Sequence, residues 1–457
     1  AGPSGLTCAY YSAINGHDVT VFERQHYAGG MMRYGIPEYR LPKATLDKEI
    51  DIIKDLGVMI MTKKALGTHI RLEDLQKDFD AVYLAIGSWR ATPMHIEGEN
   101  LPGVWLGIQF LEQVTKQADV QVGDNVVVIG GGNTAIDCAR VALRMGAKSV
   151  KLIYRRTRDE MPAEPYEVEE ALHEGVEMLF LMAPTSIVME NGKKMLQCIK
   201  MELGEPDRSG RRRPVPIEGS NFEIEADTII GAIGQSTNTQ FLYNDLPVKL
   251  NKWGDIEING NTSQTSELNI FAGGDCVTGP ATVIQAVAAG RRAAEAIDSF
   301  LMKGYVQESH IDYSCSRGSL EDLPKWDFEQ FPKLERAKMP SIDLKEREGN
   351  FKEVELGLSE EAAREEAHRC LRCGCNKRYD CDLRKEATAH DIKFEQPIHE
   401  RPYIPIVDDH PFIIRDHNKC ISCGRCIAAC AQVEGPDVLA FYMKQGRQLV
   451  GTRSGLP

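Results

Sequence analysis

Two glycine-rich turns, each at the start of a helix, constrain the fold of this chain more than any other feature. The second turn, Gly130 to Ala135, reads G-x-G-x-x-A; it follows the predicted strand Asn125–Ile129 and leads into the predicted helix Thr134–Met145. In the first turn, at the beginning of the sequence, Gly2 and Gly5 match the last two glycines of G-x-G-x-x-G. Such turns let backbone N–H groups approach a pyrophosphate at the positive end of a helix dipole. The sequence therefore predicts two nucleotide-binding units.

The two units differ in the residues at the end of the strand that follows each glycine turn. Glu23 ends the strand after the first turn, where a carboxylate holds a ribose hydroxyl pair and disfavours a 2′-phosphate. Arg155 and Arg156 stand at the equivalent place in the second unit, and guanidinium groups there accept a 2′-phosphate. We expect FAD or NAD in the first unit and NADP(H) in the second. The alternatives are two tight turns without a ligand and a solvated basic edge.

Eight of the 13 cysteines lie in two short groups near the end of the chain. The groups read C-x2-C-x-C-x5-C and C-x2-C-x2-C-x3-C, and the second spacing is that of a bacterial ferredoxin. Thiolates suit iron–sulfur clusters because soft sulfur ligands match a redox-active iron centre. A structural tetrathiolate zinc is the alternative for both groups. The predicted [4Fe-4S] ligands are Cys370, Cys373, Cys375 and Cys381 in the first group, and Cys420, Cys423, Cys426 and Cys430 in the second.

The second cysteine group leaves its fourth ligand open. In ferredoxins with two clusters, the fourth cysteine of a run ligates the other cluster. Either Cys430 completes a single cluster, or a partner run lies beyond Pro457. The five remaining cysteines have no ligand spacing, and we expect them to be core residues: Cys8, Cys138, Cys198, Cys276 and Cys315.

Charge and hydropathy argue against other classes of function. A formal charge of −13 without a concentrated basic stretch argues against binding of nucleic acid or of anionic membranes. The longest apolar runs, such as Val176–Ala183, are too short for membrane insertion. Clustered cysteines in a long α/β chain are typical of metal ligation in a reducing compartment, so we expect a cytoplasmic protein. Because the first glycine turn needs a strand before it, we also expect the natural chain to start further upstream.

Strands and helices alternate around both turns, which predicts parallel sheets with helices on both faces. We expect an α/β fold class with two Rossmann-like nucleotide-binding domains, one inserted in the other, followed by small cysteine-rich iron–sulfur domains. The insertion is indicated by a closing segment, Phe271–Asp275, that returns only after the second turn. The predicted parts are an outer domain, an inserted domain, an extended surface linker, a first cysteine segment and a ferredoxin-like domain: 1–95 with 243–305, 96–242, 306–358, 359–400 and 401–457.

A longer motif resembles the flavin-domain signature of one protein family. It is the run Gly-Gly-Met-Met-Arg-Tyr-Gly-Ile-Pro-Glu-Tyr-Arg-Leu-Pro-Lys at 29–43, and the likeness continues to Ala272–Asp275, over about the first 300 residues. Members of this family include the small subunit of bacterial glutamate synthase, the large subunit of NADH-dependent ferredoxin:NADP oxidoreductase and the N-terminal part of dihydropyrimidine dehydrogenase.

The resemblance implies FAD in the outer domain and NADPH in the inserted domain. It also implies that the helix beginning near Thr282 directs its N-terminus at the flavin pyrimidine. The residues assigned to FAD are Gly2, Pro3, Ser4, Gly5, Glu23, Arg24, Gly30, Met31, Gly87, Gly274, Asp275 and Thr282. Those assigned to NADPH are Gly130, Gly132, Asn133, Thr134, Arg155, Arg156 and Gly234.

The end of the chain carries a second resemblance. Residues 410–451 are similar to the ferredoxin-like domain in large subunits of complex-I-type hydrogenases and formate dehydrogenases. A second cysteine run follows there, so we expect this polypeptide to continue and the domain to be incomplete. Members of the flavin family usually carry an N-terminal helical domain with two iron–sulfur clusters. This sequence begins after that point, so those clusters are either outside it or replaced by the C-terminal ones.

These features fit one electron pathway, because a flavin can connect a two-electron hydride carrier with one-electron clusters. We expect an iron–sulfur flavoprotein oxidoreductase acting on NAD(P)H, in which no side chain acts as acid or base. The leading hypothesis is one subunit of an NADP(H)–ferredoxin complex, in its specific form an electron-bifurcating transhydrogenase, with ferredoxin and other electron-transfer subunits as partners. The alternatives are the NADPH-oxidising small subunit of a glutamate-synthase-like enzyme, and a structural adaptor with vestigial nucleotide folds.

Overall fold

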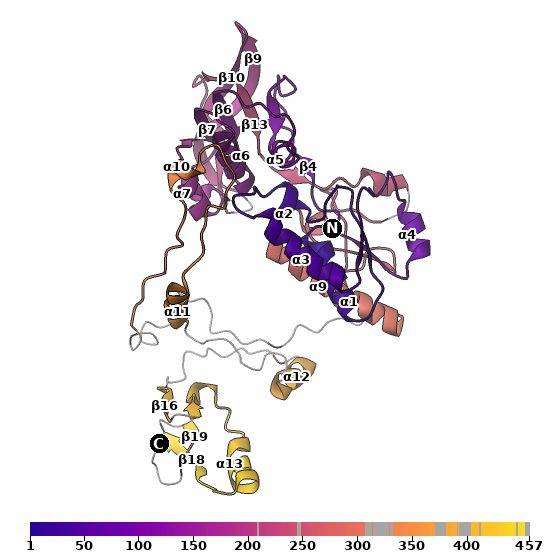
Figure 1. The fold of residues 1–457 in the computed structure, drawn as a ribbon, viewed down its shortest axis with the longest axis vertical. Helices are drawn as coiled ribbons and strands as arrows, with labels where there is room; N and C mark the ends of the chain where they lie inside the picture. Colours follow the sequence, from indigo (N-terminus) through magenta and orange to yellow (C-terminus); the bar gives the residue numbers. More distant parts are fainter. Residues whose placement is uncertain are drawn as a thin grey trace. The chain divides into compact units, whose positions relative to one another are not determined.

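The computed structural model of the chain divides into two compact units (Figure 1). The first comprises Ala1–Ser309 and Lys338–Ala363, and the second comprises His310–Ala337 and Arg364–Pro457. The residues that the structure describes are 1–207, 210–244, 248–306, 313, 329, 332–370, 381–390, 392, 404–410, 413–444 and 447–452.

Short parallel strand pairs and long helices form the outer domain. Strand β1 pairs with β2, and β3 pairs with β15, which follows the inserted domain in the sequence. Helices α1 and α9 pack against each other along the first glycine turn. The strands are β1 Thr20–Phe22, β2 Met59–Met61, β3 Val82–Leu84, β4 Arg90–Ala91 and β15 Ile270–Ala272. The helices are α1 Pro3–Ile14, α2 Met31–Tyr34, α3 Lys43–Asp55, α4 Leu72–Asp78, α8 Asp275–Thr278 and α9 Val283–Lys303.

A parallel five-stranded sheet in the order β5-β13-β6-β7-β8 forms the centre of the inserted domain. Its middle strand β6 is rich in β-branched residues, and four of its five residues are buried. The strands are β5 Val104–Leu106, β6 Asn125–Ile129, β7 Ser149–Tyr154, β8 Glu177–Phe180 and β13 Thr228–Gly231. The helices are α5 Gly107–Thr115, α6 Asn133–Arg144 and α7 Pro165–His173.

An antiparallel sheet extends from the inserted domain. Strand β10 pairs with β9, β11 and β12, and a separate short pair joins β14 to β4 of the outer domain. These strands are β9 Met182–Glu190, β10 Lys193–Pro206, β11 Arg212–Pro216, β12 Phe222–Ala226 and β14 Gln235–Ser236. The boundaries that the sequence predicts between the two domains stay a prediction.

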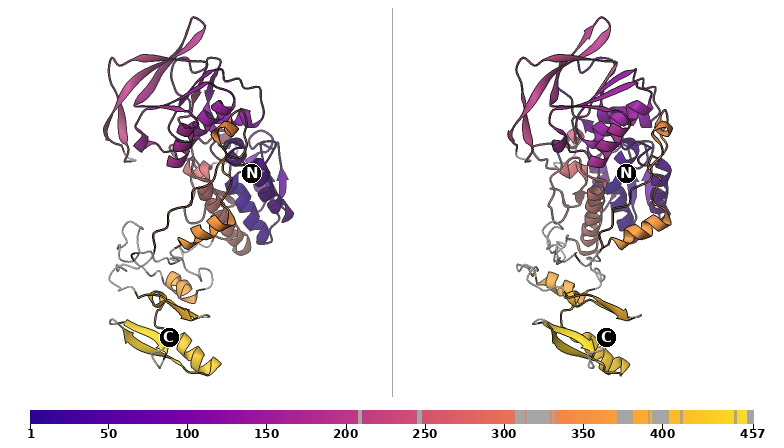
Figure 2. Two further views of the ribbon diagram at one scale, coloured as in Figure 1. Left: turned by 60° about the vertical axis from the view of Figure 1, so that its left-hand side comes forward. Right: turned by 90° about the vertical axis from the view of Figure 1, so that its left-hand side faces the viewer.

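Residues 338–363, which we call the strap, belong to the first unit. The strap contains the short helix α10, Leu344–Arg347, which lies beside the helices of the inserted domain (Figure 2). Arg347 and Val354 are buried, although the sequence analysis expected an extended surface linker here. Their burial depends on partners at least 173 residues earlier in the chain, so no local pattern could reveal it.

Short elements make up the described part of the C-terminal region. Strands β16 and β17 form one antiparallel pair, and β18 and β19 form another, in which Leu449 is fully buried. The elements are α11 Glu360–His368, α12 Asp382–Ala389, β16 Val407–His410, β17 Ile413–Arg415, α13 Arg425–Ala429, β18 Leu439–Lys444 and β19 Arg447–Thr452. Among the helices that the structure describes, none is long and apolar enough to cross a membrane.

Candidate functional site: two nucleotide turns and a cysteine run

The first glycine turn meets the glycine pair of the flavin signature motif. Gly2 precedes α1, and the N–H of Gly29 donates to the carbonyl of Ala1 at 2.7 Å. Gly30 has φ +54°, and a Cβ atom there would lie 2.6 Å from the Cα of Gly2. Glycine at position 30 therefore allows the two backbones to approach this closely at the N-terminus of a helix. The structure thus brings Gly2 and Gly30 together, with Met31 beginning α2 directly after them.

The carboxylate predicted to hold a ribose lies beside this turn. Glu23 follows β1, is buried, and accepts a hydrogen bond from the N–H of Gln25 at 2.7 Å. Its other oxygen lies 2.8 Å from the backbone nitrogen of Ala1. The neighbouring Arg24 places its guanidinium 4.3 Å from the ring centre of Trp89, a residue that the sequence analysis did not select. Trp89 follows Gly87, whose φ of +67° favours glycine.

The segment that closes the outer domain reaches the same turn from the other side. Gly274 has φ +75°, and a Cβ atom there would lie 2.9 Å from the Cβ of Ser4. Asp275, the first residue of α8, is partly buried, and burial raises the pKa of its carboxyl to about 6. Helix α9 begins directly after Thr282, where the resemblance implies a helix start, and the Thr282 hydroxyl caps it by accepting a hydrogen bond from the N–H of Gln285 at 3.4 Å.

The remaining two residues assigned to FAD lie in the first turn of α1 and allow this helix to pack against the end of β3. Pro3 is the first residue of α1, where its missing N–H costs no helical hydrogen bond. A Cβ atom at Gly5 would lie 3.2 Å from the Cβ of Ala85, so glycine lets the helix pack closely on the end of β3. The first turn thus lies at a helix N-terminus, which is the kind of place where proteins bind pyrophosphate groups.

The second glycine turn has the geometry that the motif predicts. Gly130 has φ +149°, and a methyl group there would overlap the carbonyl oxygen of Ala232. Gly132 precedes α6, and Asn133, the first residue of that helix, accepts a hydrogen bond from the N–H of Glu164 at 2.9 Å. Thr134 accepts a long hydrogen bond, 3.4 Å, from the side chain of Gln235. Gln235 follows Gly234, the last residue assigned to NADPH, whose carbonyl accepts a hydrogen bond from Thr92.

The two arginines after β7 have different environments. Arg155 is exposed, and its side chain has no hydrogen bond or ion pair within the described part of the chain. Arg156 is buried; its guanidinium donates to the carbonyl of Arg212 at 2.7 Å and to the carboxylate of Asp207 at 2.8 Å. Arg155 is therefore available to an incoming phosphate, whereas Arg156 fastens β11 to the end of β7.

The described cysteines of the two groups are at least partly accessible. Cys370, Cys423 and Cys426 are exposed, whereas Cys381, Cys420 and Cys430 are half-buried; Cys373 and Cys375 lie outside the described residues. No group of three or more potential metal ligands is gathered in the described ranges, so the predicted ligation stays a prediction.

The loop of the second group has a backbone that is compatible with a cluster. Ser422 has φ +56° and Gly424 has φ +73°, so the chain turns sharply between the cysteines. The N–H of Ser422 donates to the sulfur of Cys420 at 3.4 Å. Four thiols within eleven residues, with a backbone N–H directed at one sulfur, fit the donor set of a cubane cluster.

The isolated cysteines in the described ranges are core residues, as predicted. Cys8, Cys138, Cys198 and Cys276 are buried, whereas Cys315 lies outside the described residues. Burial raises the pKa of the Cys276 thiol to about 11, so this neighbour of Asp275 is a packed thiol rather than a reactive thiolate.

Comparison with known families decides the assignment of the first two thirds of the chain. Residues 1–290 match the family described as pyridine nucleotide-disulphide oxidoreductase. The chain belongs to this family. The family match confirms the predicted α/β Rossmann-type fold and the prediction of an oxidoreductase, and it supports FAD and NADP(H) as the cofactors of this part of the chain.

Three curated relatives confirm the resemblance read from the signature motifs. A subunit named NADPH-Fe(3+) oxidoreductase beta from Geobacter sulfurreducens is 41% identical over 411 residues, covering 82% of this chain and 60% of the relative. The NADP(+)-dependent formate dehydrogenase subunit beta of Moorella thermoacetica is 44% identical over 380 residues, covering 82% of this chain and 53% of the relative. The glutamate synthase [NADPH] small chain of Escherichia coli is 37% identical over 317 residues, covering 66% and 67%. The chain thus spans little more than half the length of the first two relatives.

A solved structure supports the fold alone. Mycobacterium tuberculosis FprA in complex with NADPH aligns with a TM-score of 0.57 at 19% identity, covering 66% of this chain and 83% of that one.

Proposed function

We propose that this chain is the NADP(H)- and FAD-binding part of a multi-subunit oxidoreductase that exchanges single electrons through [4Fe-4S] clusters. One observation carries the proposal: a single chain combines a glycine turn with a carboxylate at its ribose position, a second turn with a free arginine there, and a ferredoxin-type cysteine run. Bound FAD would supply the conversion between the hydride of NADPH and single electrons.

The outer domain would hold FAD by its backbone and by two helix ends. The N-terminus of α1 receives the pyrophosphate in the space that Gly2 and Gly30 keep open, and Glu23 orients the ribose. Asp275, with its raised pKa, lies at the start of α8 beside Ser4 and Gly274. The capped N-terminus of α9 directs its positive end at the flavin ring and favours negative charge there.

The inserted domain would select NADP(H) over NAD(H) chiefly through Arg155. The N-terminus of α6 receives the pyrophosphate after Gly132, and Asn133 fixes the start of that helix to the loop before α7. An exposed guanidinium at the end of β7 matches a 2′-phosphate in charge and geometry. Arg156 contributes by holding the neighbouring strand in place.

The cysteine groups would carry electrons between the flavin and other subunits, which include a ferredoxin in the specific form we favour. Two relatives whose names include NADPH or NADP(+) are beta subunits of larger enzymes, which supports a multi-subunit assembly. Electron bifurcation, a transhydrogenase complex and a cytoplasmic location remain parts of this proposal. A glutamate-synthase-like enzyme is the second candidate, favoured by the match to the small chain over two thirds of both sequences.

Reduction kinetics and metal analysis test the proposal on protein prepared without oxygen. We expect NADPH to bleach the bound flavin at least about tenfold more efficiently than NADH, because one lost bidentate phosphate contact costs more than 1.4 kcal/mol. We also expect iron and sulfide with little zinc. Zinc in place of iron, or a flavin indifferent to NADPH, would refute the proposal. A large amidotransferase subunit copurifying with the chain would favour the second candidate.

A further inference from the structure

The strap contacts both nucleotide domains through one buried segment. The N–H of Ile342 donates to the carbonyl of Val354 at 3.0 Å, so the strap folds back on itself around α10. The N–H of Val354 donates in turn to the carbonyl of Tyr39 in the outer domain, also at 3.0 Å. Val354 is almost fully buried and packs in the core cluster of the inserted domain. One residue of the strap thus joins the two domains.

Arg347 fastens the strap to helix α7. Its guanidinium donates to Glu170 at 2.6 Å and to Glu174 at 2.9 Å, and also to the hydroxyl of Ser341 at 3.0 Å. It is buried, with 6% of its surface exposed. A buried guanidinium is stable only when paired, so its position is dictated by the two glutamates.

These contacts belong to a larger network of four arginines and four carboxylates. Glu174 also accepts hydrogen bonds from Arg140 and Arg144 of α6. Burial raises the pKa of Glu174, but hydrogen bonds from Arg144 and Arg140 outweigh it and lower the pKa to about 2. The members are Arg40, Arg140, Arg144, Arg347, Asp137, Glu167, Glu170 and Glu174. Because the network holds equal numbers of positive and negative groups, its charges can be neutralised within it.

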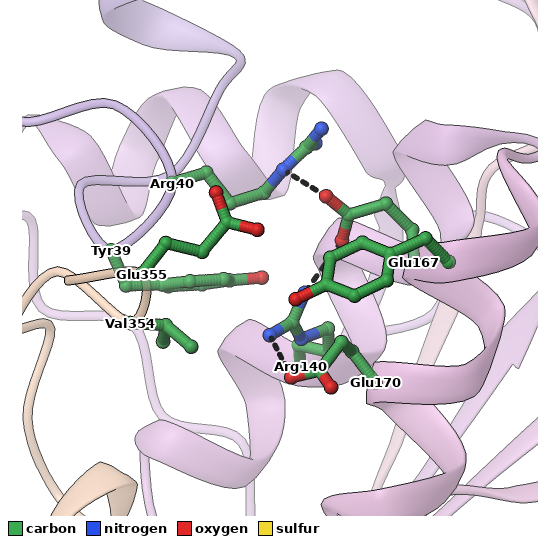
Figure 3. A pocket seen from close by; sticks show the side chains of 8 residues that line it. Tyr39, Arg40, Arg140, Glu167, Glu170, Val354 and Glu355 are labelled. Atoms are coloured by element: carbon green, nitrogen blue, oxygen red, sulfur yellow. Dashed lines mark hydrogen bonds and ion pairs between the residues drawn. The ribbon is translucent and has the colours of Figure 1, made fainter. Parts of the chain in front are cut away.

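The outer domain enters this network through two residues of the flavin signature motif. Arg40 donates to both oxygens of Asp137 at 2.9 Å, and its guanidinium also lies 2.8 Å from Glu167. Tyr39 is fully buried and lies 3.8 Å below the guanidinium of Arg144. Tyr39, Val354, Arg40 and Glu167 line a cavity of about 130 Å³. Figure 3 shows Val354 beside Tyr39, and Arg40 reaching across to Glu167.

The network lies next to the NADP(H) turn. Asp137 is four residues after Asn133, the first residue of α6, so Arg40 holds that helix one turn behind its nucleotide-binding end. Glu167 is near the start of α7, whose preceding loop is bonded to Asn133. A movement of the inserted domain against the outer domain at this place would separate Arg40 from Asp137 and Glu167, and a buried charge that loses its partner is costly.

We propose that the strap is a clamp, and that Arg347 is a positioning residue, which together fix the NADP(H) domain relative to the FAD domain for hydride transfer. The strap continues in the sequence through α11 to Cys370, so the same segment that clamps the nucleotide domains begins the path to the cysteine groups. The clamp follows from the described side chains; its consequence for hydride transfer rests on the proposed function.

Hydrogen exchange and rapid kinetics on the FAD-loaded full chain test the clamp with three variants. Arg347→Ala removes the hydrogen bonds that Glu170 and Glu174 accept from the strap. Val354→Ala loosens the strap without changing any charge, and Lys345→Ala alters an exposed residue of the same helix as a matched control. Arg347→Lys keeps the charge and should restore part of the effect.

We expect the amides of Val354, of 39–43 and of 165–174 to exchange about ten- to hundredfold faster in Arg347→Ala, since opening then costs less. Flavin reduction at saturating NADPH should slow by about tenfold or more while FAD content is unchanged, because the rate of hydride transfer falls steeply when the reacting atoms are misplaced. Val354→Ala should show the same pattern to a smaller degree, and Lys345→Ala should match the parent. Faster exchange confined to the strap, with reduction unchanged, would overturn the clamp. A parent flavin that NADPH fails to reduce would instead refute the proposed function, and the exchange measurement would still decide the clamp.

Discussion

Replacing Gly290 by alanine tests whether FAD binding depends on the close crossing of α1 and α9. Gly290 lies in the middle of α9, directly on α1. A methyl group there would overlap the carbonyl oxygen of Ser4, and it would lie 3.0 Å from the Cβ of Thr7 and 3.1 Å from the nitrogen of Cys8. Two of these three atoms belong to the backbone of α1 and cannot rotate away. The helices would have to separate.

The sign of the change in the free energy of unfolding shows whether Gly290 is packed against α1 or exposed. In an exposed helix, glycine to alanine stabilises by about 1 kcal/mol. An extra methyl group in a packed contact costs about 1–3 kcal/mol, and more where the backbone must move. We therefore expect Gly290→Ala to lower the free energy of unfolding by roughly 2 kcal/mol and to weaken retention of FAD, because α1 and α9 both begin at the proposed FAD site.

Urea unfolding and FAD content measure both effects, with Gly16→Ala as the control. Gly16 follows the end of α1, has φ +91°, and would place a methyl group in open space. This control should lose only the roughly 1 kcal/mol of backbone strain and keep its FAD. A Gly290→Ala variant that is as stable as the parent, or more so, with full FAD content, would refute the packing argument.

Further predictions address the other parts of the site. Arg155→Ala should raise KM for NADPH at least about tenfold without affecting NADH, whereas Arg156→Ala should mainly lower Tm; equal kinetic effects would contradict this assignment. Cys426→Ser should lose iron but keep FAD and NADPH-dependent bleaching, which iron and flavin analysis of one preparation would show. Burial raises the pKa of Asp137 from 3.8 to about 6, so between these pH values the folded state holds a proton that the unfolded state has lost. The free energy of unfolding should therefore fall as the pH rises through this range, and Asp137→Asn should make it less dependent on pH there.

Local signals made much of the fold predictable. The predicted strand Asn125–Ile129 is β6, and the predicted helix Thr134–Met145 is α6, Asn133–Arg144. Helix α9 begins directly after Thr282, where the resemblance to the flavin family places a helix start, and Thr282 caps it. Each of these features depends on residues within a few positions of one another, namely a β-branched run, a glycine turn and a capping side chain.

Features that depend on distant partners were not predictable. Arg155 and Arg156 are equivalent in the sequence, and only the carboxylate of Asp207 and a strand from another hairpin separate their roles. Likewise, Arg347 finds its glutamate partners 173 and 177 residues earlier in the chain. The acidic and basic composition of the strap resembles that of a solvated linker, so its burial needed the structure.

The central claim is that a flavin in this chain passes electrons from NADPH to sulfur-ligated iron. Anaerobic titration with NADPH, followed by low-temperature EPR of each sample, tests it most directly. The account predicts loss of the flavin absorbance together with the signal of a reduced cluster, which Cys426→Ser diminishes. Bleaching of the flavin without any cluster signal in iron-loaded protein would contradict it.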